Sequence, residues 1–82
     1  MIKRFRKNPE YTEAIKYTGE NQKEIASFCE FIYHGVNRDN DLSVKTSDDL
    51  IVLKVGDYVI KEKNEYRKIS EKDLYSGYEE IK

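Results

Sequence analysis

Most apolar residues of this chain fall in short segments separated by turn-forming residues, a pattern that limits the fold to one built mainly from strands. In the first clear segment Tyr11, Ile15 and Tyr17 lie on one side. Because side chains of a strand alternate between its two faces, this spacing predicts a strand from 11 to 17. Further strands are predicted at 42–46, 50–55, 58–62 and 65–69. The segment 50–55 is mostly apolar and is therefore expected to be a central strand.

One segment carries the pattern of a helix with an apolar stripe. The stripe has the spacing i, i+3, i+4 and i+7 and is formed by Ile25, Phe28, Cys29 and Ile32. Asn21 stands before it as a candidate N-cap, with Glu24 three residues later as the acid of a capping box. Gly35 follows as a residue that tolerates the left-handed conformation of a helix end. The pattern predicts a helix from 21 to 33.

A second, shorter helix is predicted near the end of the sequence. Ser70 with Asp73 repeats the capping pattern, and Leu74, Tyr75 and Tyr78 supply an amphipathic stripe. The residues 79–82 either fray or pair back as a strand, and the residues 2–7 have an extended pattern interrupted by charges.

The order of these elements is β-α-β-β-β-β-α, which predicts the α+β class. We expect one small antiparallel sheet of about five strands with both helices packed on one face, in a single domain spanning 1–82. A chain of 82 residues has a thin hydrophobic core. Because self-association adds buried area, we also expect a homo-oligomer.

The balance of charges excludes a protein that is drawn to nucleic acid by a large positive net charge. Fifteen Lys and Arg against 16 Asp and Glu give a net charge of −1, so nucleic acid is not an expected partner of the whole molecule. The only cysteine, Cys29, excludes an internal disulfide and suits the reducing cytoplasm. No apolar run approaches the roughly 20 residues that span a bilayer, so we expect a cytoplasmic protein without membrane contact.

The residue types that carry catalysis are scarce. Cys29 and His34 on the predicted helix point roughly 140° apart, which does not suit a nucleophile and its base. One Cys and one His cannot fill a zinc site. The alternating Asn37, Asp39 and Asp41 lack the glycine and the final acid of a calcium-binding loop. We therefore expect no enzyme, no metal and no cofactor.

One charge cluster stands out at the beginning of the chain. It surrounds Phe5 and consists of Lys3, Arg4, Arg6 and Lys7. In an extended segment Lys3 and Phe5 face one way while Arg4 and Arg6 face the other, so the arginines could bind phosphate or an acidic surface. Together with Tyr11 and Tyr17 this cluster is the candidate partner-binding site. The alternative is a charged edge strand that only discourages aggregation between sheets.

Two long segments carry a recognisable pattern. They are IKRFRKNPEYTEAIKYTGEN, with its "TGEN" helix start, and LSVKTSDDLIVLKVGDYVIKEKNEYRKISEKDLYSGYEE. Both resemble a family of small phage and prophage proteins. The most distinctive piece is the "GDY-I" motif of Gly56, Asp57, Tyr58 and Ile60. Only the stretch 34–41 has no counterpart, while Val55 replaces a usual proline and Tyr17 a usual tryptophan.

The resemblance implies a phage accessory protein but supplies no catalytic or binding residue to carry over. We expect a non-enzymatic binding protein that acts in the bacterial host cytoplasm by occupying a host protein, for example a defence factor. The alternative is an oligomer that sequesters a small anionic nucleotide with Arg4, Arg6 and several tyrosines. A nucleic-acid-binding or virion structural role ranks third. For the GDY motif we expect a structural role, in which Gly56 permits a bend and Asp57 bonds to nearby backbone N–H groups.

Overall fold

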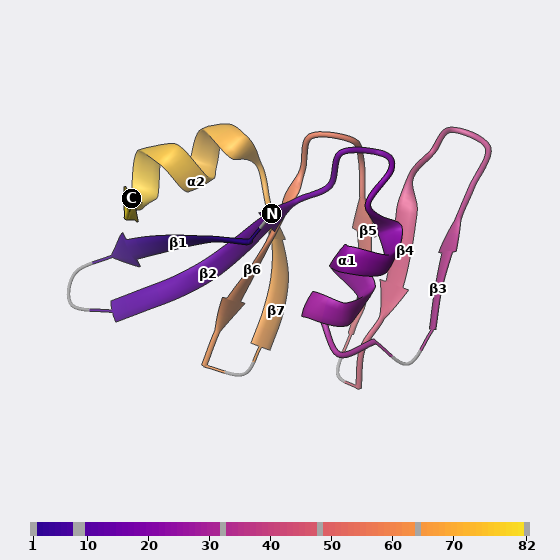
Figure 1. The fold of residues 1–82 in the computed structure, drawn as a ribbon, viewed down its shortest axis with the longest axis horizontal. Coiled ribbons are helices and arrows are strands. Elements are labelled where there is room, and N and C mark those ends of the chain that lie inside the picture. The colour runs from indigo at the N-terminus through magenta and orange to yellow at the C-terminus, as the bar shows by residue number, and fades with distance from the viewer. Residues whose placement is uncertain (1, 8–9, 32, 48, 64, 82) are drawn as a thin grey trace.

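The strands form two antiparallel sheets in the computed structural model, which describes residues 2–7, 10–31, 33–47, 49–63 and 65–81. A five-stranded sheet has the order β7-β6-β2-β1-β8, and a three-stranded sheet has the order β3-β4-β5 (Figure 1). The elements are β1 (Ile2–Lys7), β2 (Glu10–Lys16), α1 (Gln22–Phe28), β3 (Tyr33–Val36), β4 (Leu42–Lys45), β5 (Leu50–Leu53), β6 (Tyr58–Glu62), β7 (Glu65–Ile69), α2 (Glu71–Gly77) and β8 (Glu79–Ile81). The predicted α+β class is confirmed, but the prediction of a single sheet is wrong.

Helix α1 is much shorter than its apolar stripe predicts. It ends at Phe28, and Glu30 adopts a left-handed φ of 52° two residues later. The chain from Tyr33 to Val36 pairs with β4, so the hydrogen bonds of a sheet ladder replace those of the expected last helical turn. Gly35 lies within β3 and does not end the helix. Ile25 and Cys29 of the stripe are buried, Phe28 is partly buried, and Ile32 lies outside the described residues.

The two predicted caps differ in outcome. Ser70 Oγ accepts a hydrogen bond of 3.1 Å from the Asp73 N–H, as the sequence predicts for the start of α2. Asn21 makes no such bond to its own helix. Its Oδ1 instead accepts from the Thr18 N–H at 2.9 Å, while its Nδ2 donates to Glu24 at 3.1 Å. Asn21 therefore fixes the turn that precedes α1.

The central strands of the five-stranded sheet bury side chains on both faces. Ala14 pairs with Ile60 and Ile15 pairs with Val59, so neighbouring residues point to opposite faces. The first face, here called the Phe5 face, packs in one core cluster with α2: Phe5, Ala14, Tyr58, Ile60 and Leu74. The second, called the Ile15 face, packs in a larger cluster with α1 and the three-stranded sheet: Ile15, Tyr17, Ile25, Cys29, Leu42, Val44, Ile51, Leu53 and Val59.

The helices consequently cover opposite faces of the five-stranded sheet, and the prediction that both pack on one face is wrong. Leu74 anchors α2 on the Phe5 face, whereas Ile25 anchors α1 on the Ile15 face. Figure 1 shows α2 beside β1 and α1 beside β4 and β5. Consecutive burial of Tyr58, Val59 and Ile60 makes β6 the apolar inner strand that the sequence assigns to 50–55.

Strand β5 is an edge strand, not a central one. Ile51 and Leu53 point into the core, while Leu50 and Val52 are 52% and 43% exposed. Its apolar character therefore reflects one buried face and one apolar exposed face.

The GDY motif has the structural role that the sequence predicts. Gly56 has a φ of +100°, which suits the bend between β5 and β6. Asp57 Oδ2 accepts a hydrogen bond of 2.9 Å from the Lys54 N–H, and the Asp57 N–H returns one of 2.9 Å to the Lys54 carbonyl. Tyr58 and Ile60 then enter the core.

Candidate functional site

Strand β1 presents its basic side chains on alternate faces, as predicted. Phe5 is fully buried, and Arg4 and Arg6 lie on the opposite, exposed side of the strand. However, β1 is not an edge strand, because it lies between β2 and β8. The edge-strand interpretation of the basic cluster therefore does not apply to the folded chain.

Strand β8 brings acids against two of the four cations. Arg6 Nη2 lies 2.8 Å from Glu79 Oε2, and Lys3 Nζ lies 4.0 Å from Glu80 Oε1. The hydrogen bond from Arg6 to Glu79 raises the pKa of the arginine above its ordinary value. The sequence could not reveal these pairs, because they depend on the return of β8 to β1. Among the described residues, Arg4 has no ion-pair partner.

Part of the Ile15 face is not covered by α1 or by the three-stranded sheet. On this part of the face, the strand pairing places Arg6 of β1 beside Tyr11 of β2, and Arg4 of β1 beside Ile81 of β8. Ile2 lies on the same face at the beginning of β1. Three large apolar side chains are exposed here, Tyr11 at 69%, Ile2 at 47% and Ile81 at 36%. Lys61 of β6 extends the surface beyond Glu13, with which it pairs. We call the set Ile2, Arg4, Arg6, Tyr11, Lys61 and Ile81 the open surface.

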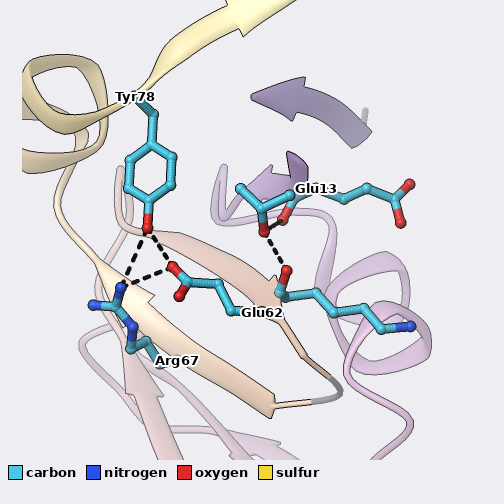
Figure 2. Close-up of polar contacts among 6 residues, drawn as sticks. Glu13, Glu62, Arg67 and Tyr78 are labelled. Carbon is cyan, nitrogen blue, oxygen red and sulfur yellow. Dashed lines mark hydrogen bonds and ion pairs between the residues drawn. The ribbon is translucent and has the colours of Figure 1, made fainter. Parts of the chain in front are cut away.

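A separate cleft lies where two hairpins diverge. The ladder between β2 and β6 ends at the pair of Glu13 and Lys61, and the β1–β2 and β6–β7 hairpins separate beyond it (Figure 1). The Thr12 hydroxyl donates to the Lys61 carbonyl at this fork (Figure 2). The resulting hollow has a volume of about 650 Å³ and is called the hairpin cleft. Its lining consists of Lys7, Glu10, Tyr11, Thr12, Glu62, Lys63, Arg67 and Tyr78.

A polar network forms one wall of the hairpin cleft. Tyr78 OH donates to Glu62 Oε1, and Arg67 Nη2 donates to the same oxygen at 2.9 Å (Figure 2). Arg67 also reaches Tyr78 OH at 3.4 Å. The bond from Tyr78, supported by Arg67, lowers the pKa of Glu62. Burial, followed by the contact with Glu62, raises the pKa of Tyr78. The carboxylate is therefore held ionised and in place.

Two further cations line the same cleft. Lys7 Nζ lies 5.5 Å from the centroid of the Tyr78 ring, a cation–π contact. Lys63 Nζ lies 3.7 Å from Glu10 Oε1, which links the tips of the two hairpins. Of the residues in this cleft, only Lys7 and Tyr11 belong to the predicted site. Lys63, Arg67 and Tyr78 are distant in sequence, and only the pairing of β6 with β2 brings them near.

Tyr17 does not belong to any surface. Its side chain is fully buried in the larger core cluster. The hydroxyl donates to the Asn40 carbonyl at 2.9 Å, which ties the loop between β3 and β4 to the end of β2. This predicted binding residue therefore has a structural role.

The residues considered for catalysis are apart from both surfaces. Cys29 is buried in the core, and burial raises the pKa of its thiol to about 11. His34 lies in β3, paired with Val44, with its ring 4.9 Å from that of Phe31. In the described part of the chain, no three His, Cys, Asp or Glu side chains gather as a metal site requires. Neither described helix has the length and hydropathy to cross a bilayer.

Comparison with known proteins adds no relative. No protein-family model, no curated protein and no solved structure matches this chain. The function must therefore be inferred from the open surface and the hairpin cleft themselves.

Proposed function

We propose that this chain is a non-enzymatic accessory protein of a phage or prophage, which binds an acidic surface of a host protein in the bacterial cytoplasm. The resemblance of its two long segments to phage proteins supports the first part of this proposal. The open surface supports the second part, and is the observation that carries it.

The open surface has the composition of a protein-binding site. Tyrosine and arginine are enriched among the residues that dominate binding energy, and Tyr11 stands between Arg6 and the hairpin cleft. The apolar side chains of Ile2 and Ile81 lie on the same face and remain exposed. A folded monomer gains nothing from exposing three large apolar side chains on one face, whereas a partner would remove them from water.

The charges of the open surface favour an acidic partner. Arg4, Arg6 and Lys61 contribute three cations against the carboxylates of Glu13 and Glu79, and because Glu79 is already paired with Arg6, Arg4 and Lys61 are the cations that a partner would meet. Arg4 and Lys61 also line a shallow hollow of about 360 Å³ next to Tyr11. A carboxylate of the partner at this position would accept charge-assisted hydrogen bonds from Arg4, which has no ion-pair partner within the part of the chain that the structure describes.

The test begins with a pull-down from a bacterial lysate and continues with titration of the purified partner by calorimetry. We expect Arg4→Ala and Tyr11→Ala each to weaken binding by about tenfold or more. Arg38→Ala is the matched control, because Arg38 is exposed in the loop between β3 and β4. All three variants should melt as the unaltered chain does, since exposed substitutions change stability by only about 0.5 kcal/mol.

Several outcomes would contradict the proposal. An equal loss of affinity in Arg38→Ala would indicate a general charge effect. Sedimentation of the chain alone as a dimer that Tyr11→Ala dissociates would assign the open surface to a second copy. A gel shift with DNA that weakens with salt and is lost in Arg4→Ala would indicate nucleic acid as the partner.

A further inference from the structure

The hairpin cleft gathers positive charge from three separate segments. Lys7 ends β1, Lys63 lies between β6 and β7, and Arg67 lies within β7. The volume of about 650 Å³ falls within the range of small-molecule sites. Lys7, Thr12, Glu62 and Arg67 of the cleft lie on the Phe5 face, while Tyr11 reaches it from the Ile15 face, where it is the cross-strand partner of Arg6.

The two ion pairs of the hairpin cleft differ in how readily an entering anion can replace their carboxylate. The side chains of Lys63 and Glu10 are 81% and 62% exposed and lie 3.7 Å apart, so their attraction is weak and screened. Arg67 and Glu62 are closer, at 2.9 Å, and Tyr78 holds the same carboxylate. An entering anion can therefore replace Glu10 at Lys63 without disturbing the wall formed by Glu62, Arg67 and Tyr78.

Lys7 provides a second position for the same anion. Its ammonium contacts the ring of Tyr78 and acts electrostatically on Glu62, but the described residues hold no carboxylate in an ion pair with it. A phosphate group between Lys7 and Lys63 would gain two charge-assisted contacts and displace only one exposed carboxylate.

The remaining lining suits an aromatic base. Tyr11 is 69% exposed and offers its ring at the mouth of the cleft. Both bonds to Glu62 end on Oε1, which leaves Oε2 without a donor from the described residues and open to an N–H group of a base. Stacking on an aromatic side chain and hydrogen bonding to a base edge are the two general ways in which proteins hold a base.

We propose that the hairpin cleft binds a nucleotide, with its phosphate between Lys7 and Lys63 and its base between Tyr11 and Glu62. This site goes beyond the proposed protein-binding function and lies mainly on the other face of the sheet, with Tyr11 shared between the cleft and the open surface. It also differs from the sequence-based expectation of a nucleotide held by Arg4 and Arg6, because those side chains lie on the Ile15 face and Arg6 is engaged by Glu79.

Calorimetry of the full chain tests the proposal with four probes: adenosine monophosphate, guanosine monophosphate, adenosine and inorganic phosphate. We expect at least one nucleotide to bind about tenfold or more tightly than both adenosine and phosphate, because only the nucleotides carry both recognised groups. The double variant Lys7→Gln, Lys63→Gln should weaken nucleotide binding by about tenfold or more. The matched variant Arg4→Gln, Arg38→Gln should leave it unchanged, because neither side chain lines the cleft.

Each result decides the proposal. Absence of binding by both nucleotides at millimolar concentration would overturn it. If inorganic phosphate binds as tightly as a nucleotide, the cleft recognises only an anion, and this result would also overturn the proposal. Equal losses in the two double variants would remove the cleft as the site. Arg4→Ala separates the two proposals, because Arg4 belongs to the open surface and does not line the hairpin cleft. We expect this variant to lose protein binding and to keep nucleotide binding.

Discussion

Replacement of Phe5 by alanine is expected to lower the free energy of unfolding by about 3–5 kcal/mol. Phe5 is fully buried in the smaller core cluster, and its ring meets that of Tyr75 edge to face at 5.3 Å. A chain of 82 residues has a total stability of roughly 4–12 kcal/mol. The variant should therefore lose a large fraction of its stability, which circular dichroism during urea titration will measure.

Phe28→Ala is the matched control for this prediction. Phe28 belongs to the sequence-predicted stripe of α1 but is only partly buried, with its ring 5.9 Å from that of Tyr66. We expect a smaller loss of roughly 1–3 kcal/mol. A larger loss for Phe28→Ala than for Phe5→Ala would mean that the Phe5 face contributes less to stability than its burial indicates.

Raising the pH from 8 to 11 is expected to cost the folded chain roughly 2–3 kcal/mol through Cys29 alone. Burial raises the pKa of this thiol from 9.0 to about 11, while the unfolded chain ionises near the ordinary value. Below pH 9 both states hold the proton, so the thiol has no effect on stability. Between 9 and 11 only the unfolded state releases it, so stability falls with rising pH.

Cys29→Ala isolates this contribution from the other groups that titrate in alkali. Burial is the largest cause that raises the pKa of Tyr66 to about 12 and acts in both proteins, whereas the smaller contribution of the Cys29 charge is lost in the variant. We expect the stability of Cys29→Ala, measured by urea titration from pH 8 to 11, to decline less steeply than that of the unaltered chain. Parallel curves for the two proteins would show that the thiol ionises equally in the folded and unfolded states.

The sequence predicts best those elements whose pattern is local. Strands β6 and β7 have the predicted bounds, and β2 differs from its prediction by one residue at each end. Alternation and turn residues lie within a few positions of each other, so no distant contact is needed to recognise them. The cap of Ser70 on α2 and the bend at Gly56 are likewise predicted from residues that are close in sequence.

What the sequence could not predict depends on pairing between distant segments. The apolar stripe beyond Phe28 is helical by periodicity, but pairing of β3 with β4 takes the following residues into a sheet. Of the two expectations for 79–82, fraying or pairing back, the structure shows the strand β8, but its partner could not be predicted. It places β1 in the interior of its sheet and supplies Glu79 to Arg6. The hairpin cleft likewise needs Lys7 and Arg67 on one face, which only the register of four strands determines.

The pairing of β1 with β8 also has a consequence for synthesis of the protein. Arg6 and Glu79 are 73 residues apart, so at usual translation rates about 4–15 s separate the appearance of the two strands. During that interval β1 has no neighbour on one side, and its backbone groups are open to strands of other chains. Lys3, Arg4, Arg6 and Lys7 then stand along an edge, where charged side chains discourage such pairing. The basic cluster is thus placed where it would discourage such pairing before β8 arrives.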